Sequence, residues 1–179
     1  MIYIIMGVSG CGKSTLGAFL SEKLGWPLHE GDDFHPQGNL DQDRLPWLLK
    51  LHEVIERERA SCSDALVACS ALKRLYRQIL LFGSKALASS SDPDQDVLPP
   101  SSPDVFFLFL HGDYDLIQQR MVARKGHYMK AELLRSQFDV LEPPSDEENV
   151  LPLDIRRGVT DMAMEVEKHI ISLMASPMP

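Results

Sequence analysis

The sequence predicts an α/β fold in which about five parallel strands form one sheet with helices on both faces. Short, continuous apolar runs alternate along the chain with segments whose apolar residues repeat at helical spacing. Continuous apolar runs are typical of parallel strands that are buried on both faces. The length of 179 residues fits one domain, so we expect a single domain that spans 1–179.

The expected strands and helices alternate from one end of the chain to the other. We expect strands at 2–6, 27–30, 65–68, 105–110 and 150–153, and helices at 13–24, 46–55, 71–81, 115–124 and 160–174. Gly25 stands where the first helix should end, Pro46 near the start of the second, and Thr160 at the cap of the last. Residues 84–104 are rich in Ser, Pro and Asp, and we interpret them as a mobile surface insertion. Ligands of such sheets bind at the carboxyl ends of the strands.

The composition of the chain argues against some classes of binding partner and indicates a cellular compartment. The formal charge is −8, from 18 basic and 26 acidic residues, which disfavours broad contact with a nucleic-acid backbone. The three cysteines, Cys11, Cys62 and Cys69, have no zinc or redox spacing and indicate a reducing compartment. No run approaches the roughly 20 apolar residues that span a bilayer. We therefore expect a cytoplasmic protein with no nucleic-acid partner and no membrane partner.

A phosphate-binding motif follows the first expected strand. Gly7–Ser14 reads GVSGCGKS and matches G-x-x-x-x-G-K-[ST], with a strand before it and a helix after it. In such a P-loop, backbone N–H groups hold the phosphates, Lys13 reaches the β- and γ-phosphates, and Ser14 ligates Mg²⁺. The motif predicts a P-loop NTPase with ATP and Mg²⁺ as cofactors. The predicted nucleotide-binding residues of the loop are Gly7, Ser9, Gly10, Cys11, Gly12, Lys13, Ser14 and Thr15.

The cysteine within this loop has two interpretations. Cys11 lies among backbone amides, which lower the pKa of a thiol and favour a redox role. The alternative is that Cys11 fills a tolerant position of the motif. We prefer the second interpretation, because a motif match needs its context before a further role is assigned.

An acidic turn, Glu30–His35 (EGDDFH), follows the second expected strand. Phosphoryl transfer to a hydroxyl needs a carboxylate that orients the nucleophile and accepts its proton, and acidic groups that hold hydrated Mg²⁺. We predict that Asp32 is the catalytic base and that Glu30 contacts the magnesium through water. His35 is predicted to bind substrate hydroxyls, with fixing of the loop as the alternative. A solvated acidic turn would explain these residues alone, but the neighbouring P-loop favours a function.

Five stretches of the chain resemble the gluconokinases of the shikimate-kinase-like P-loop group. They read GVSGCGKST, EGDDFHP, DQDRLPW, ACSALKRLYR and RKGHYMKAELLRSQFDVLEPP, and together they span most of the chain. The resemblance implies a kinase that converts D-gluconate to 6-phospho-D-gluconate with ATP and Mg²⁺. It also implies a homodimer and a small lid, at about 120–135, that closes over the nucleotide.

Basic and polar residues outside the P-loop fit a substrate with one carboxylate and several hydroxyls. Lys73 and Arg77 are four residues apart, so we expect them on one helical face, with a solvated basic face as the alternative. Arg120 and Arg124 should reach the ATP phosphates from the lid. The predicted catalytic residues are Lys13, Asp32 and Arg124. The predicted substrate-binding residues are Asp32, His35, Arg44, Ser70, Lys73, Arg77 and Gln137, and the predicted metal-binding residues are Ser14 and Glu30.

The chain departs from the gluconokinase pattern after the acidic turn. Only the four-letter stretch QGNL lies between Pro36 and Asp41, where the family has a longer segment that covers the substrate. Glu30 also stands where the family more often has Asp. Two alternatives therefore remain beside gluconate phosphorylation. One is a kinase of another small hydroxy acid, and the other is a catalytically weak variant that binds nucleotide.

Overall fold

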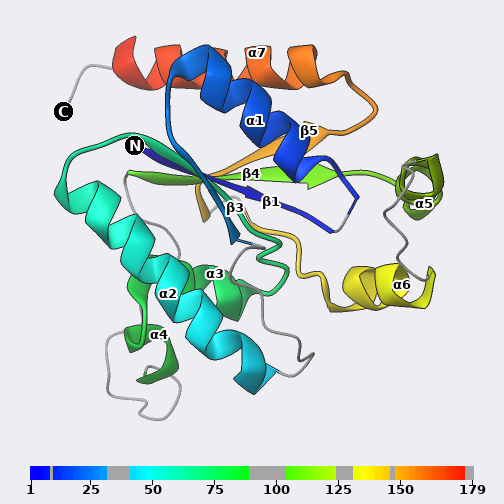
Figure 1. Ribbon diagram of the computed structural model, residues 1–179, viewed down its shortest axis with the longest axis horizontal. Coiled ribbons are helices and arrows are strands. Elements are labelled where there is room, and N and C mark those ends of the chain that lie inside the picture. Colours follow the sequence, from blue (N-terminus) through cyan, green and yellow to red (C-terminus); the bar gives the residue numbers. More distant parts are fainter. Residues whose placement is uncertain (9, 32–40, 89–103, 124–130, 146–147, 176–179) are drawn as a thin grey trace.

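Within the described residues, the protein is built around one sheet of five strands that all run parallel (Figure 1). The strands are β1 (Ile2–Met6), β2 (Leu28–Glu30), β3 (Ala65–Ala68), β4 (Val105–His111) and β5 (Val150–Asp154). Their order across the sheet is β2-β3-β1-β4-β5. The computed structural model describes residues 1–8, 10–31, 41–88, 104–123, 131–145 and 148–175. The predicted α/β fold with a five-stranded parallel sheet is confirmed.

Helices cover both faces of the sheet, as Figure 1 shows. One face carries α1 (Lys13–Leu24) and α7 (Val159–Ala175). The other face carries α2 (Asp41–Ala60) and α3 (Arg74–Phe82), and the short α4 (Lys85–Ala88) follows α3. Two further helices, α5 (Tyr114–Ala123) and α6 (Ala131–Val140), lie beyond the carboxyl ends of the strands. None of the described helices is both long enough and apolar enough to cross a membrane.

The central strand divides the core into two layers. Every residue of β1 has 0% of its surface exposed. Because side chains alternate along a strand, Ile2 and Ile4 pack with residues of α2 and α3, while Tyr3 and Ile5 pack with residues of α1 and α7. Burial on both faces is the reason that β1 is apolar at each position. This central strand leads directly into the P-loop.

Four helices begin at positions other than those predicted, and for α5, which begins at Tyr114, the difference is one residue. α2 begins at Asp41, so Pro46 lies inside it and removes only one hydrogen bond near the helix start. Burial of Trp47 against the core favours the helix despite that loss. α3 begins at Arg74, because Ala71 has a left-handed φ of 45° that no helix accommodates. α7 begins at Val159, so Thr160 lies within the first turn and does not cap the helix.

The bounds of the insertion predicted at 84–104 include residues of the folded domain at both ends. Lys85–Ala88 forms α4, which the sequence pattern did not predict, and Ala86 is buried in the core. At the other end Asp104 accepts a hydrogen bond from Arg59 and belongs to the folded domain. Residues 89–103 lie outside the described part of the chain. The pattern also failed to predict α6, the first half of which falls within the lid expected at 120–135.

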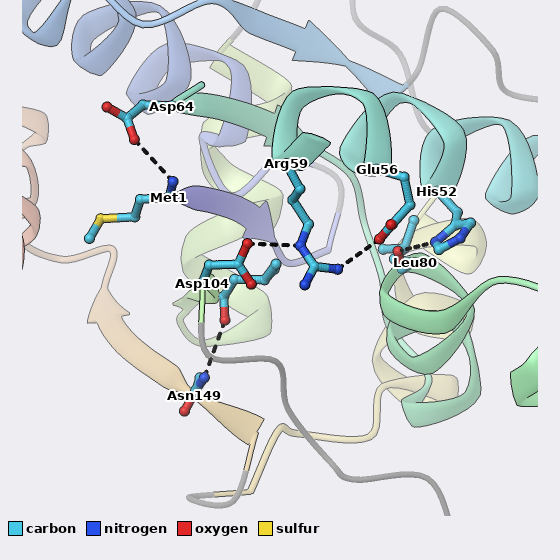
Figure 2. Close-up of polar contacts among 9 residues, drawn as sticks. Met1, His52, Glu56, Arg59, Asp64, Leu80, Asp104 and Asn149 are labelled. Carbon is cyan, nitrogen blue, oxygen red and sulfur yellow. Dashed lines mark hydrogen bonds and ion pairs between the residues drawn. The ribbon is translucent and has the colours of Figure 1, made fainter. Parts of the chain in front are cut away.

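Polar contacts fasten the amino ends of the strands, opposite the P-loop (Figure 2). The amino terminus of Met1 donates to Asp64 at 3.0 Å, just before β3. Arg59 of α2 donates to Asp104 at 2.8 Å, just before β4, and to Glu56 at 2.7 Å. Because most of these side chains are partly exposed, each pair contributes about 1 kcal/mol or less. The contacts therefore fix where the strands enter the sheet more than they add to its stability.

A half-buried histidine makes folding stability depend on pH. His169 of α7 shares a hydrogen bond of 2.7 Å with the hydroxyl of Tyr3 in β1, and burial lowers the pKa of His169 below its usual range. The folded protein therefore favours neutral His169, whereas the unfolded chain binds a proton near pH 6.5. This contribution to stability is present above about pH 6.5 and is lost as the pH falls below that value.

We predict that the melting temperature of the wild-type protein falls between pH 7.5 and pH 5.5 more steeply than that of the His169→Phe variant. Phenylalanine keeps an aromatic ring beside Tyr3 but cannot take up a proton. Melting curves of both proteins at half-unit pH steps measure the difference. Parallel pH dependence of the two proteins would mean that His169 does not carry the effect.

Candidate active site

Glycines shape the turn between β1 and α1. Gly10 has a φ of 82°, and Gly12, the residue that caps α1, has a φ of 103°. Both values lie in the left-handed region, which glycine adopts without steric cost. Gly12 has no side chain that could cap the helix, and no side-chain hydrogen bond caps α1 at this position. A helix start of this kind is an anion site.

Gly7 brings the turn against the ends of two neighbouring strands. A Cβ atom at Gly7 would lie 2.7 Å from Cys11 Sγ and 2.8 Å from the carbonyl oxygen of Leu110 in β4. The N–H of Gly7 donates to the carbonyl of Ser70, which follows β3, at 3.2 Å. Only a residue without a side chain fits this position. The P-loop therefore starts between the carboxyl ends of β3 and β4.

Lys13 lies folded over the loop that precedes it. Its ammonium group donates to the carbonyl oxygens of Gly7 at 3.0 Å and Val8 at 3.1 Å, and the residue is 9% exposed. Two backbone carbonyls thus hold a buried positive charge inside the turn. Phosphate oxygens bound by the loop could take the place of these carbonyls as hydrogen-bond acceptors.

The two predicted metal-binding residues meet beside the loop. The hydroxyl of Ser14, in the first turn of α1, donates to the carboxylate of Glu30 at 3.2 Å. Glu30 is the last residue of β2, and the carbonyl of the next residue, Gly31, accepts a hydrogen bond of 2.6 Å from the Trp47 indole. A Cβ at Gly31 would lie 2.6 Å from the carbonyl of Ala68, so β2 is held close to β3. A hydroxyl and a carboxylate are ligands that fit hydrated Mg²⁺.

Cys11 lies in a poor environment for redox chemistry. It is 1% exposed, and burial raises the pKa of its thiol although the charges of Lys13 and Arg120 act to lower it. Reactive cysteines are accessible and carry a lowered pKa. These properties favour the interpretation of Cys11 as a buried filler of the loop.

Arg120 lies beside the P-loop. Its guanidinium donates at 2.7 Å to the carbonyl of Ile155, the residue that follows β5, and its charge reaches the Cys11 thiol. Figure 1 shows α5, which carries Arg120, beyond the carboxyl end of β4. A second cation is therefore positioned near Lys13. Its predicted contact with nucleotide phosphates stays a prediction.

The structure gives no support to the predicted substrate contact of Arg77, because its charge is already paired in the interior. Arg77 is 1% exposed, and its guanidinium donates to Glu148 at 2.7 and 3.4 Å. The spacing argument that paired Arg77 with Lys73 also fails, since Lys73 precedes α3 and is not part of it. The acid that pairs with Arg77 stands in the Glu-rich loop before β5, 71 residues away. A buried arginine requires such a partner, but the sequence pattern did not identify it.

Lys73 and Ser70 lie at the carboxyl end of β3. Lys73 is half-buried at the start of α3, with its ammonium 5.5 Å from the centre of the Tyr76 ring. Ser70 is half-buried, and its carbonyl bonds the P-loop as described above. The structure thus places the start of α3 next to the phosphate-binding turn. Both residues remain predicted substrate contacts.

The remaining predicted residues are less fully described. Ser9, Asp32, His35 and Arg124 lie outside the described residues. Arg44 lies in α2, but its side chain is not among those described. Thr15 is exposed in the first turn of α1, and Gln137 is half-buried on α6. Sequence reasoning missed the contacts of Trp47 with the carbonyl of Gly31 and of Glu148 with Arg77 in α3, which join distant segments.

The chain is similar in sequence and in fold to known gluconokinases. No family model matches the chain. The chain is 42% identical to a probable gluconokinase from Xenopus tropicalis, with 95% of this chain and 93% of the relative covered. It is 41% identical to a probable gluconokinase from Rattus norvegicus, with 92% and 95% covered. A gluconokinase structure from Sinorhizobium meliloti superposes with a TM-score of 0.73 at 32% identity, over 96% of this chain and 91% of that one. At such identity over nearly the full length of its relatives, the chain belongs to the gluconokinase family.

Proposed function

We propose that the protein transfers the γ-phosphoryl group of ATP to D-gluconate and forms 6-phospho-D-gluconate. The observation that carries the proposal is the contact between Ser14 and Glu30 beside a glycine-built turn that ends in Lys13. A hydroxyl, a carboxylate and a lysine around one helix N-terminus suit a magnesium-bound triphosphate. Membership in the gluconokinase family selects gluconate among the acceptors of such kinases.

The residues proposed to bind the nucleotide belong to the P-loop and to the start of α1. Phosphoryl transfer passes through a loose transition state, so the protein acts mainly by positioning groups and by stabilising charge. The amides of the P-loop and of the α1 N-terminus would bind phosphate oxygens. Lys13 would move from the carbonyls of Gly7 and Val8 to the β- and γ-phosphates. Ser14, and Glu30 through water, would hold Mg²⁺, which when bound would supply positive charge beside the phosphates.

The acceptor end is assigned from residues at the carboxyl ends of β2 and β3. Lys73, at the start of α3, would neutralise the gluconate carboxylate, and Ser70 would bind a hydroxyl. Asp32 would orient the attacking hydroxyl and accept its proton, because it follows Glu30 by two residues at the end of β2. Arg44, His35 and Gln137 complete the proposed acceptor site. Arg120 and Arg124 are proposed to reach the nucleotide phosphates from α5 and the segment after it.

Rates of ADP release with a panel of sugar acids test the proposed substrate. We expect D-gluconate to give the highest rate among gluconate, other polyol acids, shikimate and a nucleoside monophosphate. Lys13→Ala should lower kcat by about 100-fold or more, because a preorganised cation at the transferring group is lost. Lys23→Ala, an exposed position of the same helix, serves as the matched control. The assignment would be refuted if the wild-type rate with gluconate equalled the rate without an acceptor while another acid was phosphorylated.

The assigned magnesium contact predicts a change in metal dependence. Glu30→Gln keeps the shape of the side chain and its hydrogen bond to Ser14 but removes the negative charge. We expect the Mg²⁺ concentration that gives half the maximal rate to rise several-fold, since a carboxylate binds hydrated Mg²⁺ better than an amide does. Glu22→Gln, on the exposed side of α1, should leave it unchanged. Equal metal dependence in the two variants would remove Glu30 from the proposed metal site.

A further inference from the structure

We propose that Arg77 is a positioning residue for the phosphoryl acceptor, acting through the turn formed by residues 70–73. This inference rests on the proposed function, because it assigns that turn to the acceptor side of the site. Arg77 itself does not reach the substrate, since its side chain is buried. Arg77 would instead fix the positions of Ser70 and Lys73, which are the first and last residues of the turn.

The guanidinium of Arg77 joins the backbone of the turn to a carboxylate that is remote in sequence. One nitrogen, Nη1, donates to the carbonyl of Ala71 at 2.9 Å and to that of Leu72 at 3.4 Å. The Nε and Nη2 atoms donate to the carboxylate of Glu148, which is 2% exposed. Glu148 is in turn oriented by the N–H of Ser145 at 3.0 Å. A charged donor held in this way fixes the carbonyls of the turn.

The turn that Arg77 holds has an unusual backbone. Ala71 has a φ of 45°, a left-handed conformation that costs an L-residue about 1 kcal/mol or more. Such a conformation persists only where the surroundings impose it. It separates Ser70, whose carbonyl bonds Gly7 of the P-loop, from Lys73 at the start of α3. The conformation of Ala71 therefore sets where Lys73 lies relative to the phosphate-binding turn.

A second contact holds the same turn from the exposed side. The N–H of Glu142, two residues after α6, donates to the carbonyl of Leu72 at 2.7 Å. The carboxylate of Glu142 accepts from the N–H of Arg74, the first residue of α3, at 2.8 Å. This carboxylate lies at the start of α3, where the helix dipole favours negative charge. The segment after α6 thus braces the turn both at Leu72 and at Arg74.

A need for stability alone does not explain the buried Arg77–Glu148 pair. Replacing a buried ion pair by apolar residues of similar volume is often neutral or stabilising. Apolar residues could not, however, donate to the carbonyls of Ala71 and Leu72. The Arg77–Glu148 pair therefore fixes the geometry of the turn, which an apolar pair could not do.

The double variant Arg77→Met, Glu148→Leu tests this separation of stability from geometry. It removes the pair without leaving an unpaired buried charge, so we expect a folded protein. The KM for D-gluconate should rise about ten-fold, while the KM for ATP stays within two-fold of the wild-type value. Steady-state ADP release at varied concentrations of each substrate measures both. Circular dichroism and melting curves establish that the variant is folded.

Glu142 provides a test that does not disturb the interior, because its side chain is exposed. Glu142→Ala removes the carboxylate that accepts from Arg74 and should raise the KM for gluconate about five-fold, the effect of losing one helix cap. Glu142→Gln keeps an acceptor oxygen and should restore most of the wild-type value. Asp139→Ala, an exposed acid of α6 with the same change in charge, is the matched control and should behave as the wild type.

The outcomes separate this inference from the proposed function. A selective rise in the KM for gluconate, with rescue by Glu142→Gln, would support the positioning role. A wild-type enzyme that phosphorylates gluconate, together with variants whose two KM values are unchanged or rise equally, would overturn the positioning role alone. The same conclusion would follow if Asp139→Ala reproduced the effect of Glu142→Ala. A wild-type protein that phosphorylates no sugar acid would overturn both proposals.

Discussion

The space at Gly7 is the constraint on which the rest of the site depends. The backbone leaves β1 there with its N–H bonded to Ser70 and with room for only a hydrogen atom between Cys11 Sγ and the carbonyl of Leu110. This close approach directs the following residues back across the end of the sheet and places Gly12 at the start of α1. The N-terminus of α1 therefore points at the carboxyl edge of the sheet, and this orientation places Lys13 and Ser14 at the site.

Each of the other strands then contributes one component at the same edge. β2 ends in Glu30, which meets Ser14; β3 leads to the turn before α3; β4 supplies the carbonyl that excludes a side chain at Gly7. The residue after β5, Ile155, accepts the hydrogen bond that holds Arg120. A parallel sheet brings these ends together although they are far apart in sequence. The net charge of −8 does not by itself oppose phosphate binding, since Lys13, Lys73 and Arg120 lie at this edge.

Local patterns allowed most of the sheet and the P-loop to be predicted, and non-local contacts explain most of what could not be. β1, β3 and β4 are apolar at nearly every position, and the P-loop glycines are needed for the conformation of the loop itself, so both can be recognised from neighbouring residues in the sequence. The start of α3 leaves no such signal. Ala71–Lys73 has a helical pattern, but the contacts of Arg77 and Glu142 hold Ala71 in a left-handed conformation instead. The partner of Arg77 lies 71 residues away, beyond the reach of any periodicity.

The two ends of the sheet are held by different kinds of contact, and the difference bears on catalysis. At the amino ends, most contacts join partly exposed side chains, as Arg59 does with Asp104, and such pairs are weak. Asn149, which donates to the carbonyl of Val105 at 3.3 Å, is an exception. At the carboxyl ends, buried donors are directed at backbone carbonyls: Trp47 at Gly31 and Arg77 at Ala71. A carbonyl has no rotamers, so a donor bound to it fixes the path of the chain itself. Loops held in this way before substrate arrives need little rearrangement during the reaction, which is the property that electrostatic stabilisation of a transition state requires.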